Sequence, residues 1–76
     1  MQIITQHTSS KNSGRGQVIA KGMGRQLTVS WDHSISPDDN NFEAAQALRD
    51  KYFRGLGICS PCEVRDNGQR VWTLYI

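Results

Sequence analysis

The segment from Ser36 to Arg54 is the one stretch of this sequence that can form a full helix, and it constrains what the flanking runs can fold into. Ser36 suits the N-cap and Pro37 the first helical position, and the acidic residues that follow favour the positive end of the helix dipole. Apolar residues then recur at spacings of three and four, which is typical of a core-facing stripe. This predicted stripe consists of Phe42, Ala45, Leu48 and Tyr52, widened by Ala44 and Leu56.

Short β-forming runs flank this helix on both sides. Before it, the alternation predicts strands over 2–7, 17–21 and 26–31, the last two joined as a hairpin through glycines that accept positive φ. After it, strands over 63–65 and 70–76 are joined by Asp66-Asn67-Gly68, in which Asn and Gly both tolerate positive φ. The order β-β-β-α-β-β predicts an α+β fold, a single domain over residues 1–76, with one helix packed on one face of a mostly antiparallel, curved sheet. The other face would be solvated or would bind a partner.

Length and composition exclude several classes of protein. The 76 residues are 37% hydrophobic and 21% charged, and no apolar run approaches the roughly 20 residues that a bilayer span requires. The first ten residues, MQIITQHTSS, lack the cationic start and the apolar stretch of a secretory signal. We therefore expect a cytoplasmic protein with no membrane contact.

The net charge of +2 is distributed unevenly along the chain. Residues 1–31 carry four cations and no acid (+4), whereas residues 32–76 carry seven acids and five cations (−2). The four cations fall in the first loop and first hairpin and are the candidate macromolecule-binding residues: Lys11, Arg15, Lys21 and Arg25. Such cations could follow a phosphate backbone and supply affinity without sequence specificity. The alternative that we favour is ordinary solubilising charge.

Aromatic residues could add a stacking platform for nucleic acid, but only if their rings are exposed. The candidates are Trp31, Trp72 and Tyr75. We favour a place in the core for these rings over a platform.

The tetrapeptide from Cys59 to Cys62, CSPC, is the one motif with recognisable thiol chemistry. A redox site would place its first Cys at a helix N-terminus, where the dipole lowers the thiol pKa, whereas this motif follows a helix. The pair could instead supply half of a zinc site with His7 and His33, although those two are widely separated in the sequence. The interpretation that we favour is two structural thiols at a strand entry, one of them buried as a small hydrophobe.

Asp32-His33-Ser34 contains the residue types of a hydrolytic site. Neighbours in sequence rarely point at one another, and a chain of this length can hardly enclose a cleft with an oxyanion hole. We predict a turn held by local hydrogen bonds, and no enzymatic activity.

The run from Lys21 to Asn40, KGMGRQLTVSWDHSISPDDN, resembles the small proteins of unknown function encoded by bacteriophages and prophages. The resemblance covers about a quarter of the chain and assigns no functional residue. It implies a protein that binds and blocks a host protein, as small α/β anti-restriction and anti-CRISPR inhibitors do. We therefore expect a non-enzymatic binding module, without a cofactor, whose partner is a host or phage protein. The alternative is a weakly basic nucleic-acid-binding protein that uses the first loop and hairpin.

Overall fold

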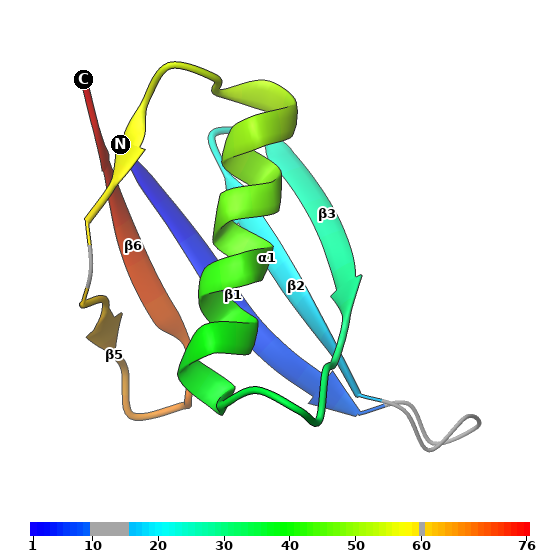
Figure 1. The fold of residues 1–76 in the computed structure, drawn as a ribbon. Coiled ribbons are helices and arrows are strands. Elements are labelled where there is room, and N and C mark those ends of the chain that lie inside the picture. The colour runs from blue at the N-terminus through cyan, green and yellow to red at the C-terminus, as the bar shows by residue number, and fades with distance from the viewer. Residues whose placement is uncertain (10–15, 60) are drawn as a thin grey trace.

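A computed structural model of the chain describes residues 1–9, 16–59 and 61–76 (Figure 1). Within these residues the chain forms one helix and six strands, in the order β1 (Gln2–Ser9), β2 (Gly16–Gly22), β3 (Arg25–Ser30), α1 (Pro37–Tyr52), β4 (Gly57–Ile58), β5 (Glu63–Val64) and β6 (Arg70–Tyr75). The predicted order β-β-β-α-β-β is confirmed, with the two-residue strand β4 as an addition.

The strands form one curled antiparallel sheet in the order β3-β2-β1-β6-β4, and β5 pairs with β6 beside β4. The first and last long strands, β1 and β6, therefore lie side by side in the middle of the sheet. α1 crosses one face, mainly over β1, β2 and β3 (Figure 1). This confirms the predicted α+β fold with a helix on one face of an antiparallel sheet.

The β2–β3 hairpin closes on a two-residue turn in which Met23 (φ 49°) and Gly24 (φ 78°) both have positive φ. Positive φ at both central residues is the mark of a type I′ turn, whose twist matches that of the flanking strands. Gly22, predicted as a turn glycine, instead pairs with Arg25 as the last residue of β2. A Cβ there would lie 2.8 Å from the Gln2 carbonyl oxygen, so Gly22 is needed for close approach of β1.

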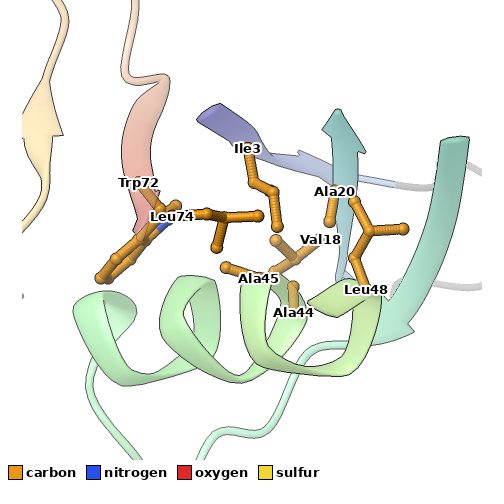
Figure 2. Close-up of a cluster of buried hydrophobic side chains, with 8 residues drawn as sticks. All are labelled: Ile3, Val18, Ala20, Ala44, Ala45, Leu48, Trp72 and Leu74. Carbon is orange, nitrogen blue, oxygen red and sulfur yellow. The ribbon is translucent and has the colours of Figure 1, made fainter. Parts of the chain in front are cut away.

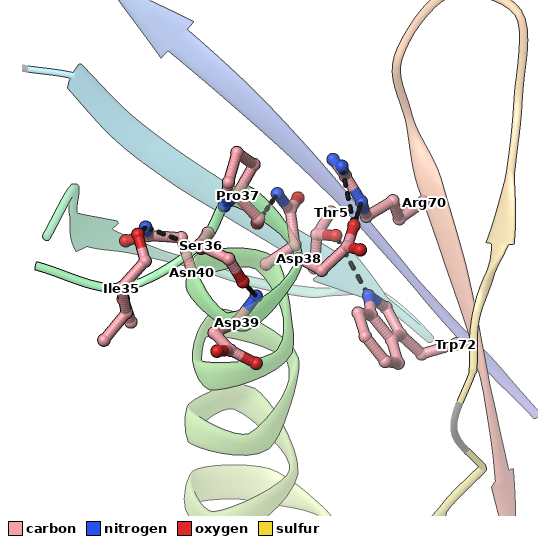
Figure 3. Close-up of polar contacts among 10 residues, drawn as sticks. Thr5, Ile35, Ser36, Pro37, Asp38, Asp39, Asn40, Arg70 and Trp72 are labelled. Carbon is pink, nitrogen blue, oxygen red and sulfur yellow. Dashed lines mark hydrogen bonds and ion pairs between the residues drawn. The ribbon is translucent and has the colours of Figure 1, made fainter. Parts of the chain in front are cut away.

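The ends of α1 follow the predicted signals. The Ser36 hydroxyl accepts a hydrogen bond from the Asp39 amide (3.1 Å), and Pro37 is the first helical residue (Figure 3). After the helix, Gly55 takes a positive φ of 96°. The first turn is also tied to the sheet, because the Asp38 carboxylate accepts a hydrogen bond from Arg70 Nε at 2.9 Å (Figure 3).

The core lies between α1 and the sheet (Figure 2). Alanines on both sides let the helix approach closely, and larger apolar side chains fill the space around them. The buried set is Ile3, Val18, Ala20, Ala44, Ala45, Leu48, Trp72 and Leu74.

Two members of the predicted stripe differ from expectation. Phe42 is only half-buried, with its ring 5.3 Å from that of Trp72. Tyr52 is 37% exposed, so its assignment to the core is wrong. Tyr52 is the last helical residue, and its ring meets the cations of Arg25 and Lys51 rather than the sheet.

Two asparagines near the start of α1 are buried, which the apolar pattern did not indicate. Asn40 Oδ1 accepts from the Asp32 amide (2.8 Å), and its Nδ2 donates to the carbonyl oxygens of Asp32 (2.9 Å) and Ser36 (3.0 Å). Asn40 thus fastens the β3–α1 connection to the helix. Asn41 Nδ2 donates to the Pro37 carbonyl oxygen, while its Oδ1 has no partner among the described residues.

Candidate functional site

The structure describes two of the four candidate cations and places their side chains on opposite faces of the sheet. Lys11 and Arg15 lie outside the described residues. Alternation along the hairpin sends the Arg25 side chain to the face that α1 covers and the Lys21 side chain to the opposite face. The described residues therefore form no continuous basic track, and macromolecule binding by these four cations stays a prediction.

Arg25 belongs to a cluster at the C-terminal end of α1. Its guanidinium carbon lies 5.1 Å from the centre of the Tyr52 ring, and Lys51 Nζ lies 5.3 Å from the same centre. Both distances fall within the range of cation–π attraction. The cluster is a small electropositive surface around one partly exposed ring.

The sheet face opposite α1 is not covered by a described helix (Figure 1). Successive side chains of a strand point to opposite faces of the sheet, so the residues of this face are those that alternate with the core residues. We call this surface the open face, and it comprises Gln2, Ile4, Gln6, Thr8, Gln17, Ile19, Lys21, Gln26, Thr28, Ser30, Gly57, Glu63, Val71, Thr73 and Tyr75.

The open face combines uncharged polar side chains with an apolar centre. Among the described residues, its charged members are Lys21 on β2 and the β5 residue Glu63, which stands opposite Val71. Ile4 and Ile19 are half-buried and neighbour one another on β1 and β2, and Val71, opposite Ile4 on β6, is buried. The face is therefore poorer in charge than the roughly 25–35% that favours the solubility of a protein surface.

The open face is hollowed at the end near the β2–β3 turn. The hollow has a volume of about 530 Å³ and is lined by Gln2, Ile4, Lys21, Gly22, Met23, Gly24, Arg25 and Gln26. A smaller depression of about 60 Å³ adjoins it along β1 and β2 and shares Ile4 and Lys21 with it. The two depressions thus adjoin one another, the larger at the turn end of the face and the smaller reaching toward Gln6 and Gln69.

The three predicted aromatic residues do not form a stacking platform. Trp72 is buried, as expected, and its Nε1 donates to Thr5 Oγ1 at 3.0 Å (Figure 3). Trp31 is half-buried and stacks on His7, with ring centres 4.0 Å apart. Tyr75 is 53% exposed on the open face, so its expected place in the core is wrong. The two tryptophans and Tyr75 thus lie on opposite faces of the sheet.

The segment Asp32-His33-Ser34 is a turn closed by its own side chains. Asp32 Oδ1 accepts hydrogen bonds from both the amide (2.9 Å) and the hydroxyl (2.6 Å) of Ser34. These bonds, the hydroxyl first, lower the pKa of the Asp32 carboxyl below its usual value. The serine hydroxyl therefore donates to a carboxylate rather than to His33, which matches the predicted turn.

Cys59 and Cys62 are free thiols in different surroundings. Cys59 is exposed, and its amide donates to the Thr73 carbonyl oxygen. Cys62 is half-buried against the core, and burial raises the pKa of its thiol. Among the described residues, no three His, Cys, Asp or Glu side chains are grouped so that they could hold a metal ion.

The glutamines of the open face were the functional candidates that sequence reasoning missed. The alternation of Gln2 and Gln6 with Ile3 and Thr5 along β1 is visible in the sequence and indicates that the glutamines share one face. The structure shows that Ile3 and Thr5 are buried and that the glutamines lie on the other face. The pattern did not show which of two similar faces the helix would cover.

No family model, curated protein or solved structure matches this chain. In the part of the chain that the structure describes, α1 is too short and too polar to cross a bilayer.

Proposed function

We propose that the protein is a non-enzymatic binding module of the phage or prophage type, active in the cytoplasm, and that its open face binds a host or phage protein. The observation that carries this proposal is the composition of the open face. Two charged side chains, Lys21 and Glu63, stand on a face that otherwise consists of uncharged polar and apolar groups, with Ile4 and Ile19 near its centre.

Protein–protein interfaces are depleted of charge in their centres, because desolvating an ion costs free energy that a neutral surface does not lose. Glutamine and threonine side chains can donate and accept at the rim of such an interface. The two depressions add concave shape, and Tyr75, which is exposed on the same face, is the kind of amphipathic ring that interfaces favour.

The test compares two variants that each change the net charge by two units. Gln2→Arg with Gln6→Arg places two cations beside Ile4 on the open face, where both glutamines are exposed. Glu43→Arg makes the same change on the exposed side of α1. Affinity capture from the native host is followed by titration of the purified candidate partner in a calorimeter. We expect the partner to bind wild type and Glu43→Arg alike, and the double variant at least about 100-fold more weakly.

Equal binding of the partner by all three proteins would refute the open face as the binding surface. The unfolding midpoints of the three proteins are measured first, so that a loss of affinity is not mistaken for a loss of folding. Retention of nothing by the wild-type protein would count against protein binding altogether.

Nucleic-acid binding is the second candidate, and the cluster of Arg25, Lys51 and Tyr52 favours it. Two cations around a partly exposed ring offer both phosphate contact and stacking. If this function is correct, affinity for generic DNA or RNA falls steeply between about 50 and 200 mM salt. Lys21→Glu with Arg25→Glu would then abolish binding, whereas the cationic Gln2→Arg, Gln6→Arg variant would strengthen it. No binding at low salt would exclude this candidate.

A further inference from the structure

The two edges of the sheet are built differently. One edge consists of β4 and β5, each only two residues long and separated by the segment that contains Pro61. Very short edge strands and prolines are common means by which proteins prevent unwanted strand pairing. The other edge is β3, six residues long, and no described residue pairs with its outer side (Figure 1).

The register of the β2–β3 hairpin identifies the unpaired groups of β3. The Trp31 amide donates to the Gly16 carbonyl oxygen at 2.9 Å, and Gly22 stands opposite Arg25 next to the two-residue turn. Hydrogen-bonded and non-hydrogen-bonded pairs alternate along an antiparallel ladder. The residues whose N–H and C=O groups point away from β2 are therefore Gln26, Thr28 and Ser30.

These three residues carry neither charge nor proline, and their side chains lie on the open face. Their spacing lets an antiparallel copy of β3 form hydrogen bonds with the outward N–H and C=O groups of all three residues at once. In that register Gln26 faces Ser30 of the second copy, Ser30 faces its Gln26, and Thr28 faces its Thr28. Threonine opposite threonine is a favourable cross-strand pair.

Charges agree with the same register. It places Arg25 opposite Trp31 of the second copy and next to its Asp32, an exposed carboxylate whose pKa is lowered. The two copies of Arg25 are about 20 Å apart, beyond the Debye length at physiological salt. Each end of the paired strands thus carries one cation and one anion, and like charges stay apart.

We propose that a second copy of this chain is the partner of the β3 edge, paired antiparallel about a two-fold axis at Thr28. The dimer joins the two sheets into one, so that the open faces of the two copies become continuous. Pairing through one strand buries less than a standard interface, and we therefore expect a dissociation constant of about 100 µM. This inference stands independently of the protein binding proposed above.

Amide hydrogen exchange of the wild-type chain, read by NMR, tests the proposal residue by residue. The amides of Gln26, Thr28 and Ser30 should exchange about fourfold more slowly at 1 mM protein than at 10 µM, by mass action with a constant of about 100 µM. The amides of Leu27 and Val29, which already bond to β2, should show the same exchange at both concentrations. Concentration-independent exchange at all five positions overturns the proposal.

Charge pairing at the two-fold axis provides the second test, because residue 28 faces itself. Thr28→Lys and Thr28→Glu should each be monomeric in sedimentation equilibrium at 1 mM, since like charges stand directly opposite one another. An equimolar mixture of the two should form heterodimers, and Thr28→Val should dimerise as wild type does. Circular dichroism confirms that each variant is folded.

Further results would overturn the proposal. A wild-type chain that remains monomeric at 1 mM overturns the proposal. Pairing of the β3 edge with a strand of another protein, without dimerisation, overturns it as well. A dimer that both charged variants retain uses a different surface, and this too overturns the proposal.

Discussion

Replacing Asn40 with alanine is expected to destabilise the protein by about 2 kcal/mol, because one side chain provides several buried hydrogen bonds. Asn40 is 3% exposed and bonds to both the amide and the carbonyl group of Asp32 at 2.8 and 2.9 Å. Each such bond contributes about 1 kcal/mol net, which gives the total. The bond to Ser36 adds little, since that carbonyl oxygen also accepts the Asn40 amide at 3.0 Å.

The measurement is the free energy of unfolding from a urea titration followed by far-ultraviolet circular dichroism. Asn40→Asp is an informative second variant, because it keeps the acceptor for the Asp32 amide and loses both donations. We expect it to lose at least as much stability as Asn40→Ala, because its second carboxylate oxygen faces the carbonyl oxygens of Asp32 and Ser36 and a buried charge loses its hydration.

Asn67→Ala is the matched control. Asn67 is exposed, and its Oδ1 accepts one hydrogen bond, from the Gln69 amide at 3.1 Å. Its loss should cost less than about 1 kcal/mol, since water can replace the bond. If Asn40→Ala costs no more than Asn67→Ala, the role given to Asn40 in fastening the β3–α1 connection is refuted.

Four further predictions concern the core, the helix cap, the hairpin and the thiols. Leu48→Ala should cost about 2 to 5 kcal/mol in the same titration, because Leu48 is fully buried; a loss under about 0.5 kcal/mol would contradict this. Ser36→Ala should cost about 1 kcal/mol through the lost cap, and an unchanged midpoint would argue against it. Met23→Asn should raise stability by about 0.5 to 1 kcal/mol, because Asn tolerates the left-handed conformation better; a lower melting temperature would show otherwise. Iodoacetamide should alkylate exposed Cys59 before Cys62, whose raised pKa keeps its thiol protonated; mass spectrometry of partly labelled protein would reveal the reverse order.

Local signals predicted the secondary structure well. The cap at Ser36, the following Pro37 and the stripe through Ala45 and Leu48 act over one or two turns of chain, so a single segment contains all the information. The turn at Gly68 is equally local. β4 was missed because two residues carry no periodicity, and they become a strand only by pairing with β6.

The candidate site was less predictable. Lys21 and Arg25 are close in sequence, but the period of two in a strand places their side chains on opposite faces of the sheet. Tyr52 continues an apolar pattern beyond the last core layer, where cations meet its ring. Asn40 looks like one more polar residue in the helix, and its role depends on Asp32, eight residues earlier in the chain.

The sequence by itself determined the elements: where the helix begins, which residues alternate, and where two of the turns fall. Tertiary structure alone decided that β1 and β6 pair in the middle of the sheet, which of the two faces α1 covers, and that β3 has no described strand on its outer side. The physical reason is the separation along the chain over which each interaction acts. Capping, turn chemistry and periodicity act between neighbours, whereas strand order and the choice of face depend on contacts between residues as distant as Ile3 and Trp72.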